Sequence, residues 1–244
     1  MRSRALFVAG LVVVALVMAS GVAWAASISC PNRAGDLCVG TNKKDTMVGR
    51  NRADEMRGKD GADTLRARRG KDTLSGGPGR DALSGGNADD TYVFGMNDWG
   101  NDTITDTASP DNDPDTGNFA EFGSPDQFLT TSLTINLTSS AGSPEVRNSS
   151  FTSTVNWSNN AIDGVYVGSI TDDTINGNAG ANTIVSNIGP DSDDTINAGA
   201  GNDWISVLDF AGGDSVDCGE DGFGITDDDQ VFFDPGDTIT NCER

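Results

Sequence analysis

A period of nine residues is the feature of this sequence that most restricts its fold. Six aspartates follow one another at intervals of nine, and each is followed two positions later by an apolar or aromatic residue. The pairs are Asp45/Met47, Asp54/Met56, Asp63/Leu65, Asp72/Leu74, Asp81/Leu83 and Asp90/Tyr92. Nine residues are too few for a helical repeat and fit one turn plus one short strand. The period therefore predicts stacked turns and strands.

Glycines accompany the aspartates at two fixed positions. Gly58, Gly76 and Gly85 stand five residues before an aspartate, whereas Gly61, Gly70 and Gly79 stand two residues before one. Glycine tolerates positive φ and close backbone approach, so these positions predict tight turns. Other residues occupy the corresponding positions at Lys43, Arg52, Ala67 and Ala88. We expect those loops to bind a ligand weakly or not at all.

The best single copy is Gly76-Gly77-Pro78-Gly79-Arg80-Asp81-Ala82-Leu83-Ser84. It resembles the RTX, or haemolysin-type, calcium-binding repeat G-G-x-G-x-D-x-U-x, in which U is a large aliphatic residue. The resemblance covers residues 40–106 well and 165–242 loosely. It implies a parallel β-roll in which calcium lies between stacked turns, held by the Asp carboxylate and turn carbonyls. It also implies that Asp45, Asp63 and Asp81 line one edge of the roll, and that Asp54, Asp72 and Asp90 line the other.

The physics of stacked turns also favours calcium. Strands in a sheet lie about 4.8 Å apart, and two carboxylates at that distance repel by roughly 1 kcal/mol in water and by more near a protein surface. A divalent cation between them reverses the sign of this interaction. Calcium accepts six to eight oxygens in loose geometry, whereas magnesium requires a stricter octahedron. We therefore predict several Ca²⁺ ions, and an apo first array that is poorly folded.

A second, looser array follows the first. The pattern of Asp or Asn, any residue, then an apolar residue recurs at steps of 8 to 15 residues. Its copies are Asp173/Ile175, Asn182/Ile184, Asp194/Ile196, Asp203/Ile205, Asp214/Val216, Asp229/Val231 and Asp237/Ile239, and Asp102-Thr103-Ile104 is a stray copy. The candidate ligand residues of this array are Asp173, Asp194, Gly199, Gly201 and Asp203. Asn182 stands where an aspartate is expected.

These patterns predict an all-β chain: a parallel β-roll or β-helix solenoid of nonapeptide repeats with an irregular insert between two arrays. The expected parts are a signal peptide (1–25), a capped N-terminal roll (26–106), an acidic loop and β insert (107–164), and a second solenoid with a C-terminal cap (165–244). Within the insert, residues 133–137 and 153–157 alternate like strands. They predict either wider rungs of the solenoid or a hairpin.

The N-terminus has the features of a secretory signal. Arg2 and Arg4 precede an apolar run over residues 5–17, and Ala23-Trp24-Ala25 offers a small-x-small cleavage site. We expect cleavage after Ala25 and no membrane span in the mature form. A signal anchor and a lipidated Cys30 are the less favoured alternatives.

An exported chain meets an oxidising environment, in which cysteines form disulfides. The four cysteines, Cys30, Cys38, Cys218 and Cys242, allow three pairings. Pairing of neighbours closes one small loop at each end of the mature chain, so we expect Cys30–Cys38 and Cys218–Cys242. Zinc is the alternative, but no Cys-x₂₋₄-Cys spacing is present.

Charge is divided unequally along the chain. Residues 27–106 hold 13 acidic and 12 basic residues, whereas residues 107–244 hold 24 acidic and only 2 basic ones. The bases of the first array could form a contact strip for anionic glycans. The interpretation we favour is that they offset Asp charge in solvated turns. Nucleic acid is not expected as a partner, because phosphate binding needs a strongly basic surface.

The function expected from these features is that of a secreted, monomeric, non-catalytic calcium-binding protein. The chain has no histidine, which excludes Ser-His-Asp and Cys-His catalysis and every histidine-bearing metal site. A cell-surface or matrix adhesin that contacts glycan or cell wall through the solenoid face is the main alternative. A calcium-dependent polysaccharide lyase and an ice-binding solenoid, the latter suggested by the triplets Thr103-Ile104-Thr105 and Thr238-Ile239-Thr240, are less favoured.

Overall fold

The computed structural model describes eleven segments of the chain. They are residues 26–31, 37–95, 99–106, 118–123, 129–130, 132–137, 146–148, 154–157, 162–186, 192–219 and 228–242. The expected signal segment 1–25 and most of the acidic loop that follows residue 106 lie outside the described residues. No helix long and apolar enough to cross a membrane occurs in the described part of the chain.

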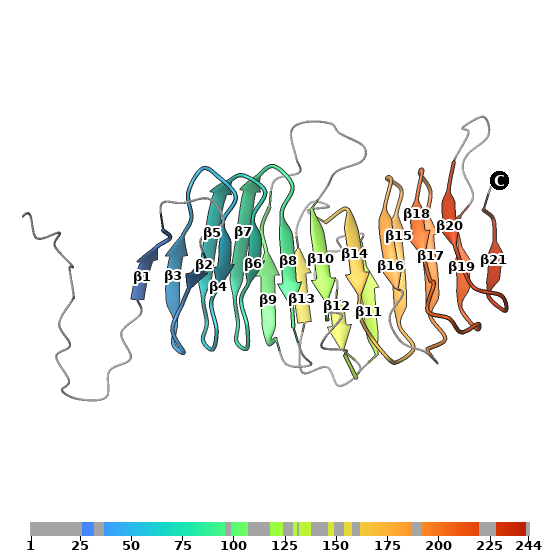
Figure 1. Ribbon diagram of the computed structural model, residues 1–244, viewed down its shortest axis with the longest axis horizontal. Helices are drawn as coiled ribbons and strands as arrows, with labels where there is room; N and C mark the ends of the chain where they lie inside the picture. The colour runs from blue at the N-terminus through green and yellow to red at the C-terminus, as the bar shows by residue number, and fades with distance from the viewer. Residues whose placement is uncertain are drawn as a thin grey trace, which may run out of the picture.

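The described residues form two long sheets that face each other along one axis (Figure 1). Sheet A contains, in spatial order, β1 (Ala26–Ser29), β3 (Asp45–Val48), β5 (Thr64–Arg69), β7 (Ala82–Asn87), β9 (Asn101–Ile104), β13 (Thr154–Trp157), β12 (Val146–Asn148), β11 (Leu133–Asn136), β15 (Thr174–Asn178), β17 (Thr195–Gly199), β19 (Ser215–Asp217) and β21 (Thr238–Thr240). Sheet B contains β2 (Leu37–Val39), β4 (Glu55–Arg57), β6 (Thr73–Ser75), β8 (Thr91–Phe94), β10 (Phe119–Phe122), β14 (Gly164–Val167), β16 (Thr183–Ser186), β18 (Trp204–Ser206) and β20 (Gln230–Phe232). The predicted β-solenoid is confirmed.

Successive nonapeptides alternate between the two sheets, so residues eighteen apart become neighbours. In sheet A, Met47 pairs with Leu65 and Leu65 with Leu83, while in sheet B Met56 pairs with Leu74. All five of these side chains are buried. Because side chains alternate across a strand, one large apolar residue per repeat is enough to fill the space between the sheets. The apolar residue two positions after each aspartate is therefore the core of the solenoid.

The insert between the arrays combines the two forms predicted for it. In sheet B, β10 and β14 continue the parallel stack as ordinary strands. In sheet A, β11, β12 and β13 form an antiparallel meander whose outer strands pair in parallel with β15 and β9. The meander reverses the order of strands in space, yet it leaves both sheets continuous. The two arrays consequently belong to one solenoid (Figure 1).

An aromatic cluster marks the end of the first array. The rings of Phe94 and Phe122 stack with centroids 4.9 Å apart, and Trp99 lies 5.8 Å from Phe122. All three side chains are buried. Large rings here fill the wider section of the solenoid where the nine-residue period stops. Phe119, in contrast, is only partly buried.

Polar columns cover the outer face of sheet A in the second half. Thr134, Thr174 and Thr195 pair in successive strands. Beside them, the side-chain amide of Asn197 donates to Asn176, and that of Asn176 donates to Asn136, each at 2.8 Å. These amide bonds join the second array to β11 of the insert.

Disulfides close both ends, with the pairing predicted from the sequence. Cys30–Cys38 links the residue after β1 to β2, and Cys218–Cys242 links the residue after β19 to the segment after β21. The Cα–Cα distances are 5.2 and 5.0 Å. Each bridge thus involves at least one strand at the end of a sheet: β1 and β2 at one end, and β21 at the other.

Candidate metal site

Two columns of aspartates run along the two edges of the first array. Asp45, Asp63 and Asp81 precede or begin strands of sheet A, and Asp54, Asp72 and Asp90 precede strands of sheet B. This is the division between edges that the RTX resemblance implies. Between 0% and 3% of each residue is exposed, so the carboxylates are buried under the turns. Burial of a carboxylate is unfavourable unless hydrogen bonds or a cation compensate for it.

In four of these aspartates, one carboxylate oxygen accepts a backbone N–H of the neighbouring turn on the same edge. The main-chain N–H of Asp45 donates to Oδ1 of Asp63, and that of Asp63 donates to Oδ1 of Asp81, each at 2.7 Å. On the other edge, the N–H groups of Asp54 and Asp72 donate to Oδ1 of Asp72 and Asp90 at 2.7 and 2.8 Å. Asp63, Asp72, Asp81 and Asp90 therefore each hold the turn that stands eighteen residues before them.

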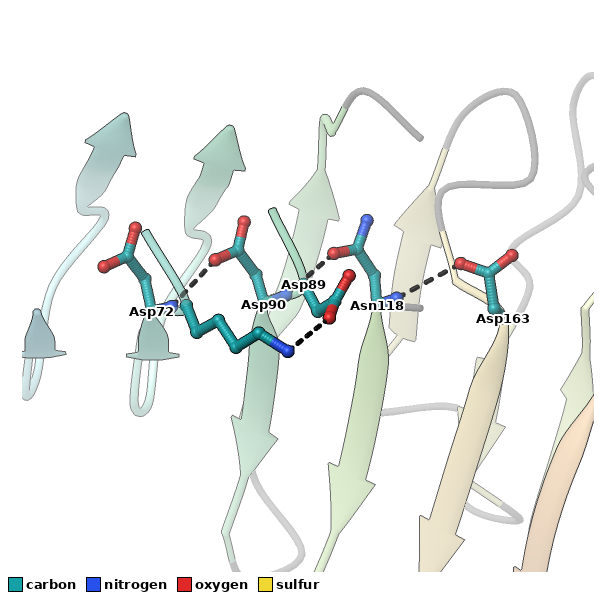
Figure 2. A network of polar contacts seen from close by, with 6 residues as sticks. Asp72, Asp89, Asp90, Asn118 and Asp163 are labelled. Atoms are coloured by element: carbon teal, nitrogen blue, oxygen red, sulfur yellow. Dashed lines mark hydrogen bonds and ion pairs between the residues drawn. The ribbon is translucent and has the colours of Figure 1, made fainter. Parts of the chain in front are cut away.

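The second column extends beyond the nine-residue period. Figure 2 shows Asp72, Asp90, Asn118 and Asp163 in one line: the N–H of Asp90 donates to Asn118 Oδ1 at 2.9 Å, and that of Asn118 to Asp163 Oδ2 at 3.1 Å. On the opposite edge, the N–H of Asp81 donates to Oδ1 of Asp102 at 2.8 Å. The sequence pattern identified Asp102 only as a stray copy, and it did not identify Asn118 and Asp163 as members of the column.

A signal for the missed residues was present in the sequence. Asn118-Phe119-Ala120 and Asp163-Gly164-Val165 both follow the pattern of Asp or Asn, any residue, then an apolar residue. The period could not reveal them, because Asn118 lies 28 residues after Asp90 and Asp163 lies 45 residues after Asn118.

The other carboxylate oxygen separates the early turns from the later ones. In Asp63, Asp72, Asp81 and Asp90, Oδ2 is buried and has no hydrogen-bond partner among the described residues. In Asp45, by contrast, Oδ2 accepts the N–H of Thr41, and in Asp54 it accepts the N–H of Arg50, both at 2.5 Å. The turn before Asp45 therefore satisfies its carboxylate internally, whereas Asp54 keeps its other oxygen, Oδ1, buried and without a partner among the described residues. The next four leave an oxygen directed into the turn.

The backbone of the turns shows the same division. In the four turns before Asp63, Asp72, Asp81 and Asp90, the residues four and two positions before the aspartate have positive φ. They are Lys59 and Gly61, Arg68 and Gly70, Gly77 and Gly79, and Gly86 and Ala88. Lys43 and Arg52, at the second of these positions in the first two turns, do not have positive φ. The prediction that glycine is needed two residues before the aspartate was incomplete, because the position four residues before it is also left-handed.

The glycine five residues before the aspartate provides space for the carboxylate. A Cβ atom on Gly76 would lie 2.2 Å from Oδ2 of Asp81, and one on Gly85 would lie 1.9 Å from Oδ2 of Asp90. On Gly58 it would lie 2.4 Å from Oδ2 of Asp63. The carboxylate thus occupies the volume that a side chain at the glycine position would need.

Burial makes these carboxylates weak acids in the metal-free protein. Desolvation, together with the neighbouring carboxylate on the same edge, raises the pKa of Asp63 to about 6 and that of Asp81 to about 7. On the other edge, the pKa of Asp72 is raised to about 7 and that of Asp90 to about 8, again chiefly by burial. The hydrogen bond that each carboxylate accepts from a backbone N–H lowers its pKa, but it does not offset desolvation.

A second buried polar group adjoins this edge. The hydroxyl of Tyr92 accepts the N–H of Gly85 at 2.9 Å and donates to Oδ2 of Asp106. Burial, followed by the charge of Asp106, raises the pKa of Tyr92. The phenol therefore stays protonated and acts as a fixed donor inside the solenoid. Sequence reasoning assigned Tyr92 to the core and did not identify this contact.

The residues present fit a hard, oxygen-liganded cation. The described residues contain no group of three or more His, Cys, Asp or Glu side chains that could hold a metal by side chains alone. Carbonyl oxygens are abundant, however: the carbonyl oxygens of Lys59 and Gly61 would lie 2.4 and 1.6 Å from Cβ atoms placed on Gly77 and Gly79. Mixed carboxylate and carbonyl ligands are those that Ca²⁺ accepts. Asp63, Asp72, Asp81 and Asp90, with the carbonyls of their turns, are the residues that would hold it.

The second array has the same architecture with fewer free acceptors. The N–H of Asp173 donates to Asp194, that of Asp194 to Asp214, and that of Asn182 to Asp203. Gly199 and Gly201 have φ of +105° and +114°, which repeats the left-handed pair of the first array. Burial raises the pKa of Asp173 to about 8.

Two positions of the second array use their side-chain oxygens within the protein. Oδ2 of Asp194 accepts the hydroxyl of Ser186 at 2.5 Å, and Oδ1 of Asn182 accepts the N–H of Asn178 at 2.9 Å. Asn182 is also neutral. Asp173, whose Oδ2 is buried and unpartnered among the described residues, is the better candidate ligand there.

The comparisons with known proteins agree with this geometry. A family model described as the RTX calcium-binding nonapeptide repeat matches four times, over residues 39–74, 57–92, 163–192 and 188–207. The first two matches cover the turns of the nine-residue period, and the last two fall in the second array. No curated protein matches the chain.

Proposed function

We propose that this chain, in which the RTX calcium-binding nonapeptide repeat matches four stretches, is a secreted, non-catalytic calcium-binding β-roll protein whose fold is completed by several Ca²⁺ ions. The ions would lie between stacked turns on the two edges. Bound calcium supplies positive charge that compensates the buried carboxylates and draws neighbouring turns together.

The buried Oδ2 atoms of Asp63, Asp72, Asp81 and Asp90 carry this proposal. A buried charged oxygen without a partner costs several kcal/mol or takes up a proton. The raised pKa values show that the metal-free fold favours protonation. A cation at the same oxygens would remove the cost at neutral pH. Asp45 offers no comparable oxygen, because Ala26 and Thr41 donate to both of its carboxylate oxygens, whereas Asp54 keeps Oδ1 unpartnered among the described residues.

Two features support secretion. Both disulfides belong to the folded structure, and disulfides persist mainly in oxidising compartments. The basic and apolar N-terminal segment with its small-x-small site is the second feature.

Two features support a non-catalytic role. The chain contains no histidine, and residues 107–244 contain only Arg147 and Arg244 as bases. A lyase that uses calcium to acidify its substrate also needs a base positioned beside the metal. The acidic residues of the two columns are already engaged with backbone N–H groups of the neighbouring turns.

Calcium titration followed by circular dichroism and thermal melting tests the proposal. We expect the chelated chain to lose β signal and to regain it with a midpoint on the order of 10⁻⁴ to 10⁻³ M Ca²⁺, the range of extracellular modules. Magnesium at equal concentration serves as the control and should restore little. A chelated protein that keeps its full β signal and melting temperature would contradict the proposal.

A further inference from the structure

A cleft of about 420 Å³ lies on the sheet B edge of the second array. It spans the turns that lead into β16, β18 and β20, and its lining includes Thr183, Asn202, Trp204, Asp228 and Gln230. Its volume is within the range of small-molecule binding sites, roughly 300 to 1,000 Å³. The lining also includes Asn182 and Asp203, two positions of the second array's columns, so the cleft lies beside a candidate calcium turn. Its outer residues Asn202, Trp204, Asp228 and Gln230 are not among the calcium ligands proposed above.

Trp204 is the notable residue of this cleft. Its neighbour Ile205 is fully buried, whereas 39% of Trp204 is exposed. Tryptophan is usually buried over most of its surface, and exposed aromatic rings are concentrated at binding sites. Phe232 packs against it with ring centroids 5.5 Å apart, which fixes the orientation of the indole. The ring is therefore a rigid apolar platform at the margin of a polar cleft.

The polar residues stand in line with this platform. Thr183 and Gln230 are the direct register partners of Trp204 in the neighbouring strands β16 and β20. Adjacent strands lie about 4.8 Å apart, so the three residues form a short row across the sheet. Asn202 and Asp228, both exposed, lie in the turns beside this row. A ligand lying along the row would contact an aromatic face, amides, a hydroxyl and a carboxylate.

We propose that this cleft binds a neutral oligosaccharide. A sugar ring presents an apolar C–H face, which suits the indole, and hydroxyls that both donate and accept, which suit the side chains of Asn202, Gln230 and Asp228. None of the described residues lining the cleft is basic. This half of the chain has 24 acidic and 2 basic residues, so it repels anionic glycans. A cationic glycan offers the same hydroxyls as a neutral one, so it serves to test whether charge rather than the sugar surface drives binding.

Titration of the full chain in calcium with hexasaccharides tests this site. The probes are maltohexaose and cellohexaose as neutral chains, hexagalacturonate as an anionic one and a glucosamine hexamer as a cationic one. Binding is followed by calorimetry and tryptophan fluorescence. We expect at least one neutral chain to bind with Kd below about 1 mM and the anionic chain not to bind. Failure of both neutral chains, or binding of the cationic chain alone, would overturn the proposal.

A matched pair of variants locates the binding. Trp204→Ala should weaken binding at least about tenfold, because it removes the platform. Phe210→Ala should change binding less than about twofold, since Phe210 is a 97% exposed aromatic residue outside the cleft lining. Equal binding by parent and Trp204→Ala would refute the site. Calcium titration of Trp204→Ala should match that of the parent, so that failure of the glycan site is distinguishable from failure of calcium binding.

Discussion

Oδ1 of Asp81 accepts the backbone N–H of Asp63 at 2.7 Å, across a separation of eighteen residues. The second oxygen of the same carboxylate has no partner among the described residues. The side chain therefore has two separable roles: one oxygen holds the neighbouring turn in register, and the other is available to a cation. An asparagine can perform the first role but not the second.

The first prediction separates these roles with Asp81→Asn. This variant can retain the hydrogen bond from Asp63 but loses the anionic oxygen, so we expect its calcium-induced rise in melting temperature to shrink clearly. Without calcium it should be as stable as the parent at neutral pH, or more stable, because a buried charge has been removed.

Asp45→Asn is the matched control on the same edge. Oδ2 of Asp45 accepts the N–H of Thr41, and Oδ1 accepts the N–H of Ala26 at 3.2 Å. We expect little change in the calcium response of this variant. Equal losses in both variants would show that the first turn binds calcium as the later ones do.

The second prediction concerns pH. Folding raises the pKa of Asp81 to about 7 and that of Asp90 to about 8, above the ordinary value of about 3.9. A raised pKa means that the folded state binds protons more tightly, which stabilises the fold fully below about pH 4. This stabilisation is lost as the pH rises through 6 to 8. In chelator, the melting temperature should therefore fall between pH 5 and pH 9.

Calcium should reverse this dependence, because the cation binds the ionised carboxylates. Its apparent affinity should rise over the same pH interval. The double variant Asp81→Asn/Asp90→Asn should flatten both profiles relative to the parent. A chelated protein whose melting temperature rises with pH would contradict the raised pKa values.

The third prediction tests the space beside the carboxylate. Gly76→Ala places a Cβ atom 2.2 Å from Oδ2 of Asp81 and should destabilise the protein by about 1–3 kcal/mol, as overpacking does. Gly95→Ala is the control, because its Cβ meets nothing within 4 Å. It should stay within about 0.5 kcal/mol of the parent. Urea unfolding midpoints measured in the presence of calcium test this prediction. Equal midpoints for the two variants would rule out the steric role.

The fourth prediction compares the two disulfides. Cys218–Cys242 spans 24 residues and Cys30–Cys38 spans 8. In the chain-entropy account, stabilisation grows with the logarithm of loop length, so the longer bridge should contribute about 1 kcal/mol more. Paired Cys→Ser variants of each bridge, unfolded in urea, measure the difference. A larger loss on removing Cys30–Cys38 would indicate that native contacts at that end outweigh loop length.

The sequence predicted the fold wherever its period is regular. The spacing of Asp63, Asp72 and Asp81 specifies which residues stack, because a nonapeptide that alternates between two sheets brings residues eighteen apart together. The period contains no information about the antiparallel meander of β11, β12 and β13, because these strands do not follow the nine-residue repeat. Their alternating residues indicated strands but not their order.

The site was predictable in its residues and only partly in its inequality. Lys43 marked the turn before Asp45 as weak, but Ala67 and Ala88 marked in the same way the turns before Asp72 and Asp90, whose second oxygens have no partner among the described residues. Nothing in the spacing distinguishes Asp45 from Asp63, although their second oxygens have different partners. That difference follows from the backbone of the preceding turn. Lys59 and Arg68 adopt positive φ although a residue with a side chain disfavours it. Stacking against the neighbouring turns imposes this conformation. The continuation at Asn118 was hidden by the length of chain that separates it from Asp90.

The hydrogen bonds of the aspartate columns all point the same way along the chain: the earlier residue donates and the later one accepts. A turn therefore cannot complete its own bonding, and only the turn stacked on it, eighteen or more residues later, can do so. The columns are consequently polar: loss of one carboxylate leaves an unpaired backbone donor in the earlier turn of the same edge and no unpaired donor in the later one.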